Sequence, residues 1–178
     1  MNAPDDVADS MKVDRTSFEF EELFRAHYGR ITRVIVRVVR DYARAEELAA
    51  EVFWKLIHNP QAQGEQCLGW LHRTAVHMSL NELRREARQA RYERLFGFGR
   101  RIANPEEAHA EAEQQQRVRA VLAAMDRRQA ELLLLRNEGF SYQELARALD
   151  LNPGSVGTFL ARAQQAFRKE YFKRYGEQ

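Results

Sequence analysis

Three observations predict an all-α protein made of two small helical domains joined by a flexible linker. Apolar residues recur at spacings of three and four along most of the chain, and no stretch shows the two-residue alternation of a strand. Hydrophobic residues make up 44% and charged residues 30% of the 178 positions, which is typical of a soluble protein with exposed helices. Near residues 96–104, glycines and a change from basic to acidic residues interrupt the helical pattern and mark a domain boundary.

The first domain is expected to occupy residues 16–95. It follows a polar, acidic stretch, 1–15, which has little to bury and is predicted to be disordered. Its helices are predicted at 17–40, 43–58 and 66–94. The inward-facing residues of the second helix are predicted to be Leu48, Val52, Phe53, Leu56 and Ile57. Between the second and third helices lies a polar loop, 59–66, that contains no apolar anchor.

The second half of the third helix is strongly basic. The segment 84–101 contains seven arginines and two glutamates, although the net charge of the whole chain is only +2. The arginines that share one helical face are Arg84, Arg85, Arg88 and Arg91. Such a face can neutralise DNA phosphates and release their counterions. The alternative is a solvated helix whose arginines pair with glutamates along the helix, namely Glu82, Glu86 and Glu93.

The second domain is predicted at 105–178, after a linker at 96–104. Asn104-Pro105, followed by two glutamates, indicates the start of its first helix. The inward-facing residues of that helix are predicted to be Val118, Val121, Leu122 and Met125. Asp126 is predicted to cap a second helix, 127–138, which Gly139 ends.

Residues 140–167 have the spacing of a helix-turn-helix. Ser141 and Glu144 form a capping box at the start of its first helix. Asn152 is the predicted N-cap of its second helix, and Pro153 suits the first turn. The second helix of such a motif can enter a DNA major groove. The alternative is a plain helical hairpin with no role in DNA binding.

The residue types give little support for catalysis, metal binding or a membrane span. The single cysteine, Cys67, cannot form an internal disulfide, and no Cys/His set has zinc-finger spacing. Glu106 and His109 form a Glu-x-x-His pair without the partner motif that a di-metal site requires. His27 and His77 are expected to be ordinary core or surface histidines. Because the chain has no run of about 18 apolar residues and no signal peptide, it is expected to be cytoplasmic. Because no catalytic or metal-ligand motif appears, it is also expected to be non-enzymatic and to need no metal or cofactor.

Two blocks of the sequence resemble one protein family. The first, at 45–59 and 69–86, reads AEELAAEVFWKLIHN and GWLHRTAVHMSLNELRRE and resembles region 2 of bacterial sigma factors. The second, at 124–167, reads AMDRRQAELLLLRNEGFSYQELARALDLNPGSVGTFLARAQQAF and resembles their region 4. The order, linker and total length are similar to those of ECF (extracytoplasmic function) sigma factors, the smallest class, which keep only regions 2 and 4.

The resemblance implies a sigma factor that binds core RNA polymerase and directs promoter recognition, DNA melting and transcription initiation. Its implied partners are the clamp helices and flap of the polymerase, promoter DNA and an anti-sigma factor. The residues implied to dock on the polymerase are Glu46, Glu47, Glu51 and Lys55. Those implied to bind the −10 element are Asn59, Gln61, Gln63, Gln66, His72, His77, Asn81, Arg84, Arg85 and Arg88. Those implied to bind the −35 element are Asn152, Ser155, Thr158, Phe159, Arg162 and Arg168.

The sequence departs from the family in the second helix of the helix-turn-helix. The family commonly has a basic residue at the position of Gly157 and an arginine at that of Phe159, so weaker −35 binding is expected. Two other functions stay open: a helix-turn-helix regulator that binds DNA without polymerase, and a sigma-like decoy held by a regulator. The region 2 block favours the sigma factor, because a simple regulator has no use for a polymerase-docking helix.

Overall fold

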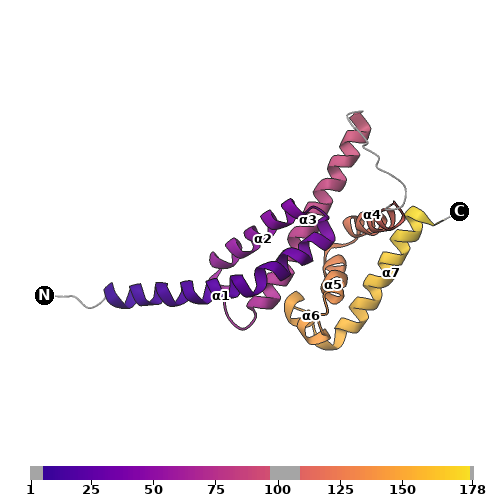
Figure 1. Ribbon diagram of the computed structural model, residues 1–178. Helices are drawn as coiled ribbons and strands as arrows, with labels where there is room; N and C mark the ends of the chain where they lie inside the picture. The colour runs from indigo at the N-terminus through magenta and orange to yellow at the C-terminus, as the bar shows by residue number, and fades with distance from the viewer. Residues whose placement is uncertain (1–5, 97–108, 177–178) are drawn as a thin grey trace.

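The structure, a computed structural model, describes residues 6–96 and 109–176, with side chains described for 20–96 and 112–176. Every regular element in these ranges is helical, which confirms the predicted fold class (Figure 1). The elements are α1 (Asp6–Val39), α2 (Tyr42–Ile57), η1 (Pro60–Ala62), α3 (Cys67–Phe96), α4 (His109–Ala124), α5 (Arg127–Asn137), α6 (Tyr142–Leu149), η2 (Pro153–Ser155) and α7 (Val156–Tyr175). Within them, no helix combines the length and apolar character needed to cross a membrane.

α1 begins at Asp6, well before the start predicted at residue 17. Residues 6–15, predicted to be disordered, are therefore helical, whereas residues 1–5 lie outside the described part of the chain. The sequence between Asp6 and Gly29 contains no proline or glycine. The backbone can thus continue its hydrogen-bonded helix without a helix-breaking residue from Asp6 to Tyr28.

α1, α2 and α3 enclose one buried apolar cluster. Its largest fully buried members are Ile31, Ile35, Val52, Phe53, Leu56 and Leu71. The turn between α1 and α2 depends on Arg40, which adopts a left-handed conformation with φ of 64°. Asp41 then caps α2 by accepting a hydrogen bond from the Arg44 backbone N–H at 3.0 Å, so the two helices reverse direction within two residues.

The C-terminal half follows the predicted caps closely. Asp126 accepts from the backbone N–H of Gln129 at 3.1 Å, and the Ser141–Glu144 capping box is formed in both directions. Asn152 accepts from Gly154 N–H at 2.9 Å, but the turn it caps is the 3-10 helix η2 rather than the start of α7. The predicted helix start at Asn104-Pro105 and the linker lie outside the described residues.

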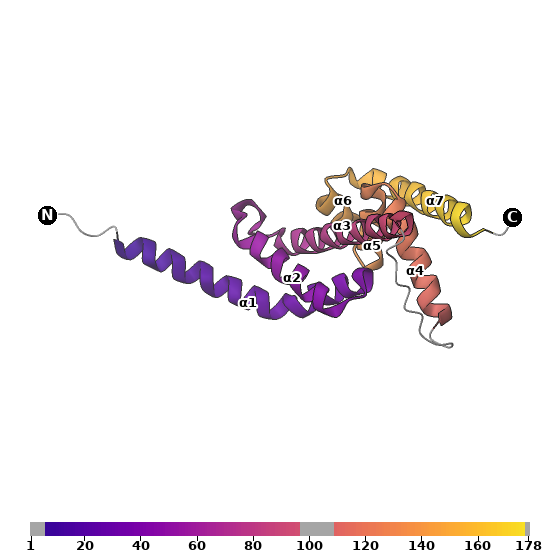
Figure 2. The same cartoon turned by 90° about the horizontal axis from the view of Figure 1, so that it is seen from above.

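The two halves of the chain share a second apolar cluster. α3 runs between the α1–α2 pair on one side and α4–α7 on the other, and it contacts α4, α5 and α6 (Figure 2). The N-terminal half contributes Val34, Val38, Val76, Leu80 and Leu83. The C-terminal half contributes Val121, Leu122, Leu132, Leu135, Leu145, Val156 and Leu160, among others. The sequence predicts two domains, and the structure packs them against each other through α3.

This shared core predicts one cooperative unfolding transition. Leu80 is fully buried at the junction, so Leu80→Ala should lower the free energy of unfolding by about 2–5 kcal/mol, through lost burial and a residual cavity. Leu68→Ala, at an exposed position of the same helix, is the matched control and should change it by about 0.5 kcal/mol or less. Urea titration followed by circular dichroism measures both. Two separate transitions, or equal losses in the two variants, would contradict the shared core.

Candidate nucleic-acid interface

Three residues predicted to bind the −10 element instead contact the C-terminal half. His77 Nδ1 lies 2.8 Å from Glu131 Oε1 on α5. Arg84 donates from Nε to the Ala123 carbonyl at 3.2 Å and from Nη2 to the Met125 carbonyl at 2.9 Å. Because the last carbonyls of a helix have no intrahelical donor, Arg84 acts as a side-chain cap for α4.

His72, the third of these residues, is buried. Its ring packs edge-on against Phe140, with centroids 5.2 Å apart, and its Nδ1 has no hydrogen-bond partner among the described residues. Burial, and then the neighbouring charge of Arg30, lowers the pKa of His72 to about 4. The imidazole is therefore neutral near pH 7 and serves here as a packing group.

The other predicted −10 residues of α3 point away from this junction. Asn81 and Arg88 are exposed, whereas Arg85 pairs with the buried carboxylate of Glu82 at 3.1 Å. The sequence offered helical Arg–Glu pairs as the alternative to a DNA-binding face, and one such pair, Arg85 with Glu82, is formed. Hydrogen bonds from Arg85, and also from Arg44, lower the pKa of Glu82.

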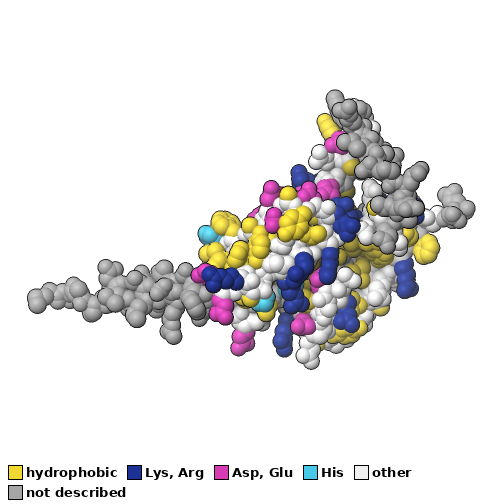
Figure 3. Space-filling view, viewed as in Figure 1, with side chains coloured by type: hydrophobic (Ala, Val, Ile, Leu, Met, Phe, Trp, Pro, Cys, Tyr) yellow, Lys and Arg dark blue, Asp and Glu magenta, His cyan; other side chains and the backbone are white. Residues whose placement is uncertain are grey.

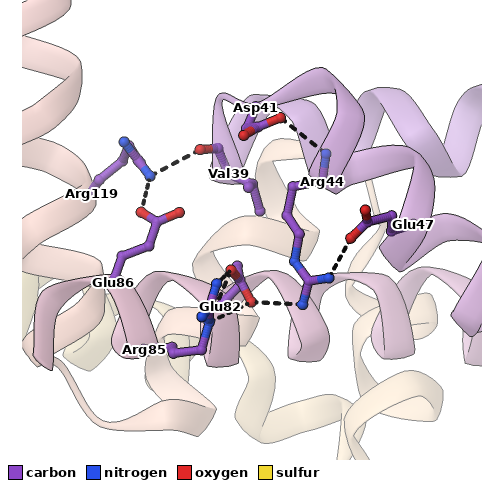
Figure 4. Close-up of polar contacts among 8 residues, drawn as sticks. All are labelled: Val39, Asp41, Arg44, Glu47, Glu82, Arg85, Glu86 and Arg119. Carbon is purple, nitrogen blue, oxygen red and sulfur yellow. Dashed lines mark hydrogen bonds and ion pairs between the residues drawn. The ribbon is translucent and has the colours of Figure 1, made fainter. Parts of the chain in front are cut away.

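Two arginines from outside α3 fix its position between the neighbouring helices (Figure 4). Arg44 of α2 joins Glu82 at 3.1 Å and Glu47 at 2.6 Å. Arg119 of α4 joins Glu86 at 2.6 Å and donates to the carbonyl of Val39, at the end of α1, at 2.9 Å. Glu86 is thus bound by an arginine of another helix rather than by an arginine one turn away on α3. Sequence spacing predicts neither Arg44–Glu82 nor Arg119–Glu86, because the partners are far apart in the chain.

The loop between α2 and α3 is only partly available for base contacts. Gln61 and Gln66 are exposed and Asn59 is half-buried. The side-chain amide of Gln63 donates to the carbonyls of Leu56 and Ile57, both at 3.1 Å, and so caps the C-terminus of α2. The expectation that this loop has no apolar anchor is wrong, because the side chain of Ala62 is buried.

The outward face of α2 carries the four predicted polymerase-docking residues. Glu46, Glu47 and Glu51 are exposed, Lys55 is half-buried, and the Lys55 ammonium lies 3.2 Å from Glu51. The sequence prediction missed the aromatic residue at the centre of this face. Trp54 is 57% exposed and stacks on His58, with ring centroids 4.2 Å apart. An exposed aromatic ring within a charged rim is typical of a protein-docking surface.

Ile57, predicted to face inward, is instead 47% exposed and extends the apolar part of this surface. It lies in the last turn of α2, directly after the buried Leu56. The sequence did contain a signal for Trp54: this large apolar residue lies outside the stripe of α2 residues that is predicted to be buried, so it has no core to pack into.

The predicted −35 residues lie mostly on the outer side of α7 and its capping turn. Asn152, Thr158, Arg162 and Arg168 are exposed, and Ser155 is half-buried. The opposite face buries Val156, Leu160 and Ala163, as predicted. Phe159 is 38% exposed, so it is a surface residue at the edge of the core.

A groove of about 380 Å³ runs between α3 and this helix-turn-helix. Its basic residues come from α3, α5 and α7, and they are Arg73, Arg127, Arg128 and Arg162. Its apolar floor includes Leu132, Leu149, Leu151 and Phe159. Asp126 and Glu131 also line the groove, but none of the four arginines forms an ion pair within the described residues. The groove therefore keeps an excess of positive charge that a polyanion can bind. The sequence gives no signal for Arg73, Arg127 and Arg128, because only folding brings them together with Arg162.

Basic side chains also gather where the two halves meet on the face shown in Figure 3. At this junction, Nη1 of Arg37 on α1 donates to both carboxylate oxygens of Glu138, which follows α5, at 2.9 and 3.0 Å. No group of three or more His, Cys, Asp or Glu side chains in the described ranges is arranged to hold a metal ion.

The neutral state of His72 predicts a specific loss of stability in acid. Because its pKa is about 4 in the folded chain, below the value of about 6.5 expected when unfolded, its contribution is complete above pH 6.5 and declines as pH falls toward 4. The loss should reach up to about 3 kcal/mol. In urea titrations from pH 7 to pH 4, His72→Phe should remove this component. An unchanged pH dependence in the variant would contradict the assignment.

Comparisons with known proteins identify the family of this chain. The model of Sigma-70 region 2 matches residues 23–89, and that of Sigma-70, region 4 matches residues 115–166. The ECF RNA polymerase sigma factor SigE of Mycolicibacterium smegmatis is 29% identical over 164 residues, covering 89% of this chain and 63% of SigE. The RNA polymerase sigma factor CarQ of Myxococcus xanthus is 26% identical over 157 residues, covering 84% of this chain and 87% of CarQ. This chain therefore spans less than two thirds of the length of SigE.

A solved structure shares the fold. The sigma factor RpoE of Bartonella quintana, in complex with the anti-sigma factor NepR, aligns with a TM-score of 0.51 and 16% identity. The alignment covers 85% of this chain and 96% of RpoE. Two family models together match more than half of the chain, in the order region 2 then region 4, so the chain belongs to the sigma-70 family of RNA polymerase sigma factors, within the ECF group.

Proposed function

We propose that this chain is an alternative bacterial sigma factor that binds core RNA polymerase, recognises promoter DNA and promotes its melting. The observation that supports this most directly is the presence, in one chain, of an exposed docking face on α2 and two separate surfaces suited to DNA, on α3 and α7. In this function the chain supplies specificity, and the polymerase carries out the nucleotide chemistry in the cytoplasm.

Docking on the polymerase is assigned to the outward face of α2. Glu46, Glu47, Glu51 and Lys55 supply its charged rim, and Trp54 supplies a fixed aromatic anchor. Within the described chain, α2 packs on α1, α3 and η1, so this face stays accessible while the C-terminal half rests on α3. A partner can therefore bind it without any change inside the chain.

Binding of the −10 element is assigned to the 59–66 loop and to α3. Gln61 and Gln66 have amide groups that can hydrogen-bond an unstacked base, and Arg88 can contact the backbone. Gln63, His72, His77 and Arg84 all have partners inside the chain. For the last three to reach DNA, α4–α6 must first move off α3. An anti-sigma factor that holds the two halves together would oppose that movement.

Recognition of the −35 element is assigned to α7 and its capping turn. Thr158 and Arg162 share an exposed face, and Arg162 reaches the basic groove. At Gly157, where the family commonly has a basic residue, a Cβ would lie 3.6 Å from the Tyr142 ring, and Phe159 brings no charge. These two positions favour weaker or differently directed −35 binding.

Transcription with purified core polymerase tests this function and separates it from that of a regulator acting without polymerase. The unaltered chain should direct initiation at a cognate promoter. Glu47→Lys with Glu51→Lys should weaken core binding about tenfold or more, because both charges on the docking rim are reversed. Glu21→Lys, at an exposed glutamate of α1, is the matched control. Specific DNA binding without promoter-directed transcription would support the regulator instead.

Arg162 should make the strongest base contact of α7. If it forms a bidentate pair with guanine, Arg162→Ala should cost about 1–3 kcal/mol of discrimination between −35 sequences. Arg168→Ala, further along the same helix, should weaken binding to all sequences alike and reduce the salt dependence. Promoter binding by holoenzymes containing each variant, at several salt concentrations, measures both effects. Unchanged specificity in Arg162→Ala would rule out this role.

A further inference from the structure

The end of α3 extends past the part of the chain that matches region 2. The family match stops at residue 89, whereas α3 continues to Phe96. In Figure 1 this end rises above the neighbouring helices. The last two turns of α3 therefore lie outside the family match, and their role depends on the side chains that this chain places there.

Three large apolar side chains are exposed on these turns. Tyr92 is 61%, Leu95 71% and Phe96 57% exposed. The rings of Tyr92 and Phe96 lie against each other, with centroids 4.3 Å apart and an interplanar angle of 35°. Two rings that pack against each other on a helix surface form an exposed apolar step that water solvates poorly.

This step continues the exposed DNA face proposed for α3. Starting from Asn81, the sequence advances by four, three, four and again four residues, through Arg85, Arg88, Tyr92 and Phe96. Residues at such spacings lie on one side of a helix. The aromatic step therefore lies along the same stripe as the polar and basic residues, one turn beyond Arg88.

The charge around the step is positive. Arg88 and Arg91 are exposed and form no ion pair within the described residues, and Arg94 donates to the Ala90 carbonyl at 3.2 Å. Of the acidic groups nearby, Glu86 binds Arg119, whereas Glu93 accepts from the neutral amide of Gln89 at 3.0 Å and keeps its charge. The arginines therefore outnumber the one carboxylate that has no cationic partner. Aromatic rings beside unpaired arginines match the requirements of a single-stranded polyanion, whose bases stack and whose phosphates bind cations.

We propose that Tyr92 and Phe96 form a stacking platform for unpaired bases of single-stranded DNA, with Arg88 and Arg91 contacting the adjacent phosphates. This inference rests on the proposed function, because it extends the DNA face of α3 beyond the family match. Stacking tolerates any base, so the platform strengthens the hold on a separated strand without adding sequence preference. It is also accessible in the present arrangement, unlike His72, His77 and Arg84.

The test uses the full chain and a short fluorescent oligothymidylate, with a duplex of equal length for comparison. Tyr92→Ala with Phe96→Ala should weaken oligothymidylate binding by roughly fivefold to a hundredfold for each ring that stacks. Tyr92→Phe with Phe96→Tyr should bind like the unaltered chain, because both rings remain. Tyr42→Ala, at a 65% exposed tyrosine on α2, is the matched control and should have no effect. Arg88→Ala with Arg91→Ala should reduce the salt dependence of oligothymidylate affinity, because phosphate contacts are lost. Tyr92→Ala with Phe96→Ala should leave that salt dependence unchanged.

Several outcomes would overturn the platform. One is that the unaltered chain does not bind oligothymidylate, and another is that it binds equally well after both rings are removed. A third is that ring removal lowers the affinity for core polymerase while oligothymidylate binding is unchanged. The last result would assign the rings to protein docking. If the unaltered chain directs promoter transcription while ring removal leaves oligothymidylate binding unchanged, the platform fails and the proposed function stands. If transcription fails, the proposed function fails whatever the oligothymidylate result.

Discussion

The position of α3 determines most of this structure, because the helix is buried on two opposite sides. Leu71, Ala75 and Met78 belong to the cluster formed with α1 and α2, whereas Val76, Leu80 and Leu83 belong to the cluster shared with α4–α7. Each burial is favourable through the apolar area removed from water. One helix therefore serves two cores, and the C-terminal half is placed relative to the N-terminal half by packing on a common surface.

Polar contacts define how the neighbouring helices are aligned on α3. Arg44 and Arg119 come from different helices and bind Glu82 and Glu86, one turn apart on the same face of α3. Each arginine also has an Nε without a partner among the described residues, so desolvation is not fully compensated. Such pairs add little net stability, but a helix that shifted by a turn would leave a carboxylate unpaired. They therefore favour a single alignment of α2 and α4.

The packing on α3 leaves some surfaces open to external partners and covers others with the C-terminal half of the chain. The outer face of α2, with Trp54 at its centre, and the aromatic end of α3 are both exposed. The middle of α3 is covered, with Arg84 capping α4 and His77 bound to Glu131. In the proposed function, polymerase docking and contact with a separated strand can thus begin before the two halves part. Full contact of α3 with DNA requires the release of these internal partners.

The sequence alone determined the features that depend on near neighbours: the helical class, the Ser141–Glu144 capping box, the Asp126 cap and the buried face of α7. These follow from backbone hydrogen bonding and from the 3.6-residue period, which act over a few residues. Only the tertiary structure decided which helix covers which apolar stripe. The stripe of α3 predicts burial but not a partner, so the shared core, the burial of His72 and the joining of Arg73 with Arg162 in one groove could not be predicted. The exposure of Ile57 and the cap that Gln63 makes on α2 could not be predicted for the same reason, because both depend on where α2 ends and on what lies beside it.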